Sequence, residues 1–210
     1  MRSDSASTTV FIVDDDPSIR EAVCNLLDAE GVASRSFGST DAFLREWEPD
    51  IPGCLLLDVR LPGMSGTAFQ EELNRRGLAI PVIIMTAHGD IPMVRKVMKA
   101  GAIEFLTKPF QREELLNAIR QAFEKDQARR EAEKAYESIR VCFETLSQRE
   151  RKVMELVAAG LPNKQIAAEL GISEITVKVH RHNVMEKMHA DSLADLVRLS
   201  DKVQQRQPRK

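Results

Sequence analysis

Acidic side chains directly follow two runs of apolar residues in the first sixty residues, a cluster of three after the first run and a single one after the second. Asp14–Asp16 follow Val10–Val13, and Asp58 follows Cys54–Leu57. Crowded carboxylates repel one another, and a hard divalent cation such as Mg²⁺ (or Mn²⁺) relieves the repulsion through oxygen ligands. A carboxylate beside such a cation can attack a phosphoryl group and form an acyl phosphate. These residue types therefore indicate phosphoryl-transfer chemistry.

A hydroxyl and an amine occupy matching places further along the chain. Thr86 ends the apolar run that begins at Pro81, and Lys108 follows Ala102–Leu106. Lys108 would pair with a phosphate, and Thr86 would hydrogen-bond it. Taken singly, Asp58 reads as an ordinary loop residue, and Asp14–Asp16 read as an exposed helix-capping turn. The combination of types, each at the end of an apolar run, favours a functional site.

Apolar runs and amphipathic stretches alternate five times over the first 110 residues. The expected strands are Val10–Val13, Val32–Phe37, Cys54–Leu57, Pro81–Met85 and Ala102–Leu106, and the expected helices are Ile19–Ala29, Thr40–Trp47, Gly66–Arg75, Pro92–Ala100 and one that begins near Arg112. This alternation predicts an α/β unit with a five-stranded parallel sheet, doubly wound and flavodoxin-like, with helices on both faces. The carboxyl ends of its strands meet at one rim, where functional groups gather.

The fifth helix is expected to be long, because no Pro or Gly occurs from Gln111 to Glu144. Small and apolar residues recur there with a 4-3-4-3 spacing, at Ala128, Ala132, Ala135, Ile139 and Cys142 or Phe143. Such a narrow seam suits a two-stranded helical contact. A solvated spacer helix is the alternative interpretation, and the residues alone leave both open.

Residues 163–188 read as helix, tight turn, helix, with the turn at Gly171–Ser173. Ser173 is expected to cap the second helix. Val177, Val184 and Met188 share one face and are expected in the core, whereas Lys178, Arg181, His182 and Met185 fall largely on the other. One apolar and one basic face after a tight turn favour an element that reads a DNA groove. A small helical subdomain with a solvated basic face is the alternative.

The charge distribution supports a polyanion partner for the C-terminal part. Residues 1–125 have 14 Lys and Arg against 19 Asp and Glu, whereas residues 145–210 have 12 against 8. A basic module on an acidic body indicates a polyanion partner. The three cysteines are widely spaced and no apolar run reaches the roughly 20 residues needed to span a bilayer, so we expect a cytoplasmic location and no membrane partner.

Residues 10–123 resemble the receiver domains of two-component response regulators. The matching segments are Val13–Asp16, Leu57–Gly66, Met85–Ala87 and Lys108–Phe110. The resemblance implies that Asp58 is the phosphoacceptor and that a sensor histidine kinase is the phosphoryl donor. It implies Mg²⁺ ligation by Asp15 and Asp58 directly, by Asp14 through water and by the backbone carbonyl of Arg60. It also implies a cis Lys108–Pro109 bond and an aromatic switch residue at Phe105.

Residues 145–200 resemble the LuxR-type helix-turn-helix domain of the FixJ/NarL family. The matching segments are Leu146–Glu150, Gly160–Ala167 and Leu170–His180. The resemblance implies base contacts from Lys178, Val179 and His182. Phosphate contacts are implied for Asn163, Lys164, Thr176 and Arg181, and Ser173 belongs to the same DNA-binding set. The long linker makes the FixJ-like subgroup the nearest match.

Together these features predict a phosphorylation-controlled transcriptional activator that dimerises, binds promoter DNA and contacts RNA polymerase. The expected parts are a flexible N-terminus at 1–9, a receiver domain at 10–123, a helical linker at 124–144, a DNA-binding domain at 145–202 and a polar tail at 203–210.

Two competing functions account for part of this pattern. A Mg²⁺-dependent phosphohydrolase of the haloacid-dehalogenase type would have a second aspartate two residues after its nucleophile, and here that position is Arg60. We therefore expect autophosphorylation and slow loss of the protein's own phosphoryl group, and no enzyme acting on external substrates. The other competitor is a C-terminal module that binds protein, against which its positive charge counts.

Overall fold

The computed structural model describes residues 8–87 and 91–206, which divide into two compact units. The first unit ends at Arg129 and the second begins at Arg130. Most of the expected N-terminal stretch, residues 1–7, lies outside the described residues, as do 207–210 of the expected tail.

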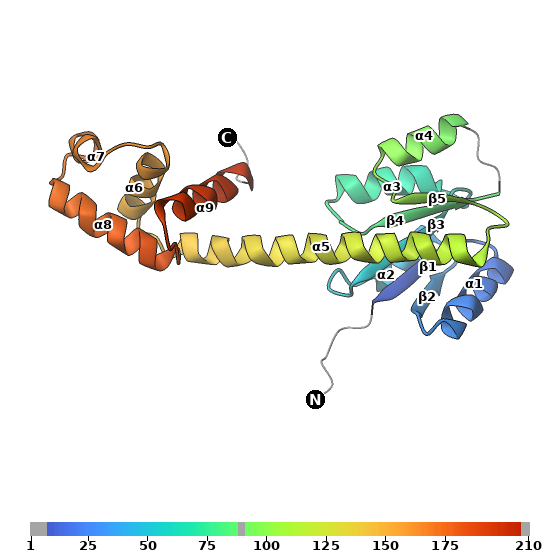
Figure 1. The fold of residues 1–210 in the computed structure, drawn as a ribbon. Coiled ribbons are helices and arrows are strands. Elements are labelled where there is room, and N and C mark those ends of the chain that lie inside the picture. Colours follow the sequence, from blue (N-terminus) through green and yellow to red (C-terminus); the bar gives the residue numbers. More distant parts are fainter. Residues whose placement is uncertain (1–7, 88–90, 207–210) are drawn as a thin grey trace. The chain divides into compact units, whose positions relative to one another are not determined.

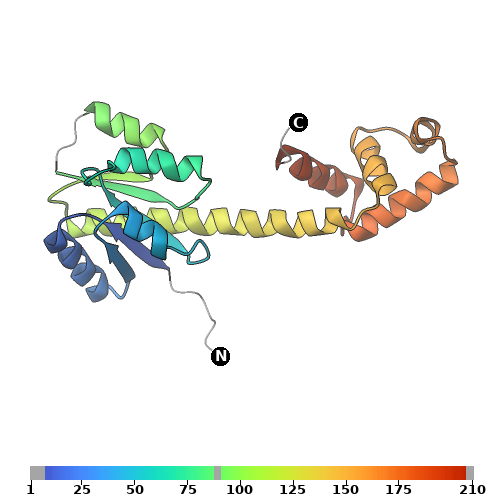
Figure 2. The ribbon, with the colours of Figure 1, turned by 180° about the vertical axis from the view of Figure 1, so that it is seen from behind.

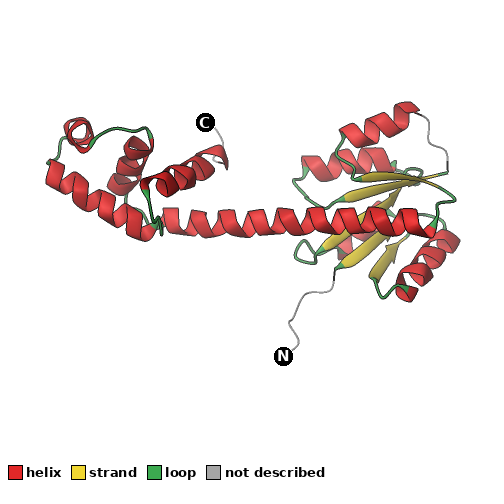
Figure 3. Cartoon of the chain, in the orientation of Figure 1, coloured by secondary structure: helices red, strands yellow, loops and turns green. Residues whose placement is uncertain are grey.

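The first unit is a parallel sheet with helices on both faces (Figures 1 and 3). Its strands are β1 (Thr9–Val13), β2 (Ala33–Phe37), β3 (Gly53–Asp58), β4 (Val82–Thr86) and β5 (Glu104–Thr107), in the order β2-β1-β3-β4-β5. Its helices are α1 (Pro17–Ala29), α2 (Thr40–Glu46), α3 (Gly66–Arg75), α4 (Ile91–Lys99) and the start of α5 (Arg112–Glu144). The expected flavodoxin-like fold is confirmed.

Two cores form because successive strand residues point to opposite faces of the sheet. Phe11 and Val13 of β1 pack with α2, α3 and α4, whereas Val10 and Ile12 pack with α1 and α5. The ring of Phe43 on α2 lies at the centre of the first core, where it meets three other phenylalanines edge-on and stacks on a tryptophan. Strands buried on both faces account for the near-continuous apolar runs in the sequence.

Short polar side chains fix where several helices begin. The carboxylate of Asp16 caps α1, and the hydroxyls of Ser39 and Ser65 accept from backbone amides in the first turns of α2 and α3. These caps satisfy amide groups that have no partner inside the helix. Since Asp16 and Ser65 each follow closely after a strand end, the same caps set the path of the chain around the rim of the sheet.

The second unit consists of the end of α5 and four further helices, which the two views in Figures 1 and 2 show from opposite sides. They are α6 (Gln148–Ala158), α7 (Asn163–Leu170), α8 (Glu174–Lys187) and α9 (Leu193–Arg206). α9 extends four residues into the stretch expected to be a polar tail, because Val203 is buried. The expected core residues Val177, Val184 and Met188 are all buried.

α5 contributes to the core of each unit with a different part of its length. Leu115, Ala118, Ile119 and Ala122 are buried in the first unit. Further on, Ile139, Cys142 and Phe143 pack against the core of the second unit. The last positions of the expected two-stranded seam are thus accounted for by packing within the chain's own C-terminal unit, whereas Ala128, Ala132 and Ala135 are exposed.

Candidate functional site

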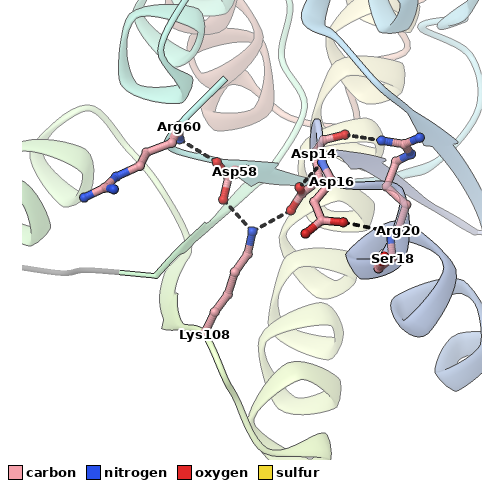
Figure 4. A network of polar contacts seen from close by, with 7 residues as sticks. All are labelled: Asp14, Asp16, Ser18, Arg20, Asp58, Arg60 and Lys108. Carbon is pink, nitrogen blue, oxygen red and sulfur yellow. Dashed lines mark hydrogen bonds and ion pairs between the residues drawn. The ribbon is translucent and has the colours of Figure 1, made fainter. Parts of the chain in front are cut away.

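Three charged side chains meet at the carboxyl-terminal rim of the sheet (Figure 4). Lys108 follows β5, and its Nζ atom lies 2.5 Å from Asp14 Oδ2 and 2.5 Å from Asp58 Oδ1. Asp14 follows β1, Asp58 ends β3, and both carboxylates are almost completely buried. The parallel order of the strands brings together residues 94 and 50 positions apart in the chain.

Backbone contacts hold Asp58 from both sides. The amide of Arg60 donates to Asp58 Oδ2 at 2.5 Å, and the amide of Val59 donates to the carbonyl of Met85 on β4 at 2.9 Å. Gly66, at the start of α3, passes so close that a Cβ atom at this position would lie 2.2 Å from the carbonyl oxygen of Asp58. A glycine is therefore required there, because only its missing side chain allows this approach.

Asp14 is held just as firmly. Its Oδ1 atom accepts from the amide of Asp16 at 2.9 Å, and its backbone carbonyl accepts from the guanidinium of Arg20 at 2.7 Å (Figure 4). Asp16 in turn caps α1 by accepting from the amide of Ser18. The side chain of Asp15, between them, is exposed.

The ionisation of the central pair follows from burial and pairing together. Burial raises the pKa of Asp58, and the hydrogen bond and charge of Lys108 only partly offset this. Burial alone would lower the pKa of Lys108, but its hydrogen bonds to Asp14 and Asp58 outweigh burial and raise that pKa. Lys108 is thus held as a cation between two carboxylates, where it neutralises part of their charge.

Thr86 and Phe105 lie where the sequence places them, on neighbouring strands. Thr86 ends β4 and is fully buried, and its carbonyl accepts from the amide of Lys108 at 2.7 Å. Phe105 on β5 is half-buried against the core formed with α3 and α4. The Lys108–Pro109 bond is cis, as the resemblance implied.

The oxygen donors of the rim fit a hard divalent cation in their chemistry. Asp14, Asp15 and Asp58 offer carboxylate oxygens, which Mg²⁺ prefers. Within residues 8–87 and 91–206, however, no three acidic, histidine or cysteine side chains are gathered as a metal-ion site. The ammonium group of Lys108 lies between the two buried carboxylates, so a cation at this place would have to displace it.

The second unit presents most of the expected DNA-binding residues on α7 and α8. The side chains of Lys164, Lys178, Val179 and His182 are exposed, and Asn163, Thr176 and Arg181 are half-buried. Arg181 Nη1 donates to Asn163 Oδ1 at 2.8 Å, which ties the two helices together. Ser173 caps α8, and its hydroxyl accepts from the amide of Thr176 at 3.1 Å. Figure 1 shows α8 following α7 across a short turn.

Two residues of α8 differ from the sequence interpretation. Helical periodicity puts Met185 on the basic face, but it packs against the core, because that core reaches around the helix as far as this position. Ile175 is absent from the expected DNA-binding set, yet 75% of its surface is exposed in the first turn of α8. Ile175 precedes Lys178, Val179 and His182 by three, four and seven residues. This spacing places the four residues on one helix face, so the sequence alone could have indicated Ile175.

Comparisons with known proteins agree with this geometry. The response regulator receiver domain model matches residues 10–120, and the model of bacterial regulatory proteins of the luxR family matches residues 144–200. Nodulation protein W of Bradyrhizobium diazoefficiens is 52% identical over 197 residues, which cover 94% of this chain and 87% of that protein. The transcriptional regulatory protein FixJ of Rhizobium meliloti is 44% identical over 193 residues, 91% of this chain and 94% of FixJ.

Solved structures give the same result. The response regulator StyR is 50% identical, with a TM-score of 0.81 and coverage of 94% of this chain and all of that one. Full-length FixJ from B. japonicum is 37% identical with a TM-score of 0.57, covering 97% and 100%.

A receiver fold with an acidic rim, joined to a helix-turn-helix unit, defines a response regulator that regulates transcription and is not a typical enzyme. The chain belongs to the FixJ/NarL family of response regulators. No helix in the described ranges has the length and apolar character needed to cross a membrane.

Proposed function

We propose that Asp58 accepts a phosphoryl group from a sensor histidine kinase and that this event controls promoter binding by α8. The observation that carries the proposal is the contact of Lys108 Nζ with both Asp14 and Asp58. An ammonium group held between two buried carboxylates can pair with a new anionic oxygen without leaving the pocket. Thr86, at the end of the adjacent strand, is the hydroxyl that would hydrogen-bond the same group.

Each group in the pocket has a distinct role in the transfer. A carboxylate oxygen of Asp58 bonds to phosphorus as the bond from phosphorus to the histidine nitrogen breaks, and that nitrogen keeps the electron pair. Lys108 then pairs with a phosphoryl oxygen. The amide of Arg60, 2.5 Å from Asp58 Oδ2, orients the carboxylate. Asp14 and Asp15 supply the remaining negative charge that defines the cation site.

Mg²⁺ or Mn²⁺ would be held by Asp14, Asp15, Asp58 and the backbone carbonyl of Arg60. When bound, such a cation neutralises charge on phosphoryl oxygens during in-line transfer. Asp15 is exposed, so its carboxylate is accessible from solvent.

An apolar groove beside Lys108 is a suitable surface for the donor kinase. It has a volume of about 370 Å³ and lies between α1 and the loop that joins β5 to α5, lined by Ile19, Ala22, Leu26, Pro109 and Phe110, among others. A helix of the kinase seated there would bring its phosphohistidine to the adjacent pocket. Exposed apolar grooves of this kind favour helical partners.

Phosphorylation is proposed to act through dimerisation. The negative charge added at Asp58 would draw the hydroxyl of Thr86 inward and let Phe105 move into the space it leaves. That motion would change the surface of α4 and β5, where Arg95, Lys96 and Lys99 are exposed and Glu104 is half-buried. Cross-pairing of these charges would join two copies, present two α8 helices to a pseudo-palindromic promoter site and recruit RNA polymerase as an activator in the cytoplasm.

Intact-mass measurement after incubation with acetyl phosphate and Mg²⁺ tests the first step. We expect one added phosphoryl group on the wild-type chain and none on Asp58→Asn. Asp41→Asn, an exposed acid on α2, is the matched control and should label normally. Equal labelling of Asp58→Asn and the wild type would contradict the assignment of the phosphoacceptor.

A further inference from the structure

The side chain of Ile175 is apolar but largely exposed, and it does not pack in the core of the second unit. It is 75% exposed in the first turn of α8, whereas Ile172, in the preceding turn, packs against the core. A single exposed apolar side chain is common on protein surfaces and needs no explanation. Here a second one, Val179, follows four residues later and is 52% exposed. Residues four apart on a helix are surface neighbours, so the two form one apolar patch.

Polar residues surround this patch on the same face of α8. Lys178 lies three residues after Ile175 and His182 seven residues after it, and both are exposed. Arg181, beside them, is tied to Asn163 of α7. The C-terminal residues 145–210 have an excess of positive charge, which favours a polyanionic partner over an apolar protein surface.

The major groove of DNA presents one apolar group that such a patch could contact. The C5-methyl group of thymine projects there, and the other base edges present hydrogen-bond donors and acceptors. Residues near the N-terminus of a recognition helix are those that reach the base edges, and Ile175 is the second residue of α8.

We propose that Ile175 is a specificity-determining residue that contacts a thymine methyl group, with Val179 beside it, and that the operator half-site contains thymine at the matching position. This inference rests on the proposed DNA binding by α8 and adds the chemical feature that the helix recognises. Lys178, between the two apolar side chains, would contact an adjacent guanine.

Replacing thymine by deoxyuridine tests the contact, because it removes the methyl group and leaves base pairing unchanged. The full chain, treated with acetyl phosphate and Mg²⁺, is first used to select sites from a random-sequence duplex pool. Each thymine of the enriched site is then replaced singly. We expect about fourfold weaker binding at one thymine per half-site, the effect of losing one buried methyl group.

Three variants separate the contact from a general effect on binding. Ile175→Ser should bind the thymine and deoxyuridine sites equally, while Lys178→Ala should keep the preference for thymine. Val141→Ser, which alters a side chain 52% exposed on α5, should behave like the wild type. The exposure of Ile175 makes a folding defect of Ile175→Ser unexpected, and circular dichroism checks this.

The outcomes distinguish this inference from the proposed function. If no duplex is enriched over the starting pool, sequence-specific DNA binding itself is wrong, and the role of Ile175 fails with it. If a site is enriched but deoxyuridine weakens wild-type binding less than twofold at every position, only the methyl contact is wrong. A change in the sedimentation of the free protein on Ile175→Ser, with the thymine preference intact, would instead assign the patch to self-association.

Discussion

The carboxylate of Asp126 on α5 accepts a hydrogen bond at 3.0 Å from the backbone amide of Gly53, the first residue of β3 and 73 positions earlier in the chain. Asp126 is buried, and its other oxygen pairs with the guanidinium of Arg129 at 2.6 Å. Its negative charge also helps burial to raise the pKa of Cys54. This contact joins α5 to the sheet beyond the last apolar residues that α5 buries there.

Replacing Asp126 should destabilise the receiver unit. Asp126→Ala leaves the Gly53 amide buried without its acceptor, and we expect a loss of about 1–3 kcal/mol in the free energy of unfolding. Asp126→Asn retains an acceptor oxygen and should lose less. Urea unfolding followed by Trp47 fluorescence reports on this unit, and Glu124→Ala, exposed on the same helix, is the control. Equal stability of Asp126→Ala and Glu124→Ala would show that the contact contributes nothing.

Removing Lys108 should separate cation binding from phosphoryl transfer. Lys108→Ala leaves the carboxylates of Asp14 and Asp58 without their cation, so Mg²⁺ should bind roughly tenfold more tightly, as expected for losing one nearby positive charge. The same variant should accept a phosphoryl group more slowly or, once phosphorylated, fail to increase its DNA binding. The reason is that no ammonium group remains to pair with the phosphate. Calorimetric titration with Mg²⁺ and intact-mass labelling measure the two effects. Weaker Mg²⁺ binding by Lys108→Ala would exclude competition between ammonium and metal.

The second unit should lose stability in acid through Glu150. Burial of Glu150 raises its pKa, but hydrogen bonds from Lys187 and Ser147 outweigh burial and hold the pKa at about 2. A lowered folded-state pKa contributes stability above the unfolded-state value, and this is lost as pH falls from there towards about 2. Urea titrations at low and neutral pH, followed by methyl NMR signals of Val153 and Val184, should show this loss. Glu150→Gln should be less stable at neutral pH and lose less on acidification.

DNA affinity should respond differently to two basic residues of α8. Lys178→Ala should weaken binding to a selected site more than to random DNA, by about 1–3 kcal/mol of discrimination. Arg181→Ala removes the proposed phosphate contact and the bond to Asn163, so both affinities should fall together and depend less on salt. Gel shifts at several salt concentrations measure both. An unchanged ratio of specific to non-specific affinity for Lys178→Ala would rule out its base contact.

Breaking α5 should uncouple phosphorylation from DNA binding. Ala128 is exposed in the helix interior, and proline there removes a hydrogen bond and destabilises the helix by about 3 kcal/mol. Ala128→Pro should still accept a phosphoryl group and dimerise on phosphorylation, but phosphorylation should no longer raise its DNA affinity. Ala128→Ser, which keeps the helix, is the control. If Ala128→Pro responds like the wild type, the switch works by another route.

The sequence predicts the receiver fold and its rim because both depend on local patterns. Strands buried on both faces appear as apolar runs, and Asp58 and Thr86 can be recognised at the ends of two of these runs. Asp126 lies beyond such reasoning, since an acid in a charged helix resembles a solvated one until its partner, Gly53, is located. Periodicity misplaces Met185 and passes over Ile175, because it gives the direction of a side chain, while the extent of the core around it depends on tertiary packing.

The middle of α5 should tolerate substitutions better than insertions or deletions. Among residues 131–138 no side chain is buried, so substitutions that preserve a helix leave the packing on either side of the segment intact. Insertions and deletions differ, because each residue added to a helix rotates the rest of that helix by about 100° and advances it by about 1.5 Å. Selection should therefore act on the number of residues in this segment and leave its composition to drift.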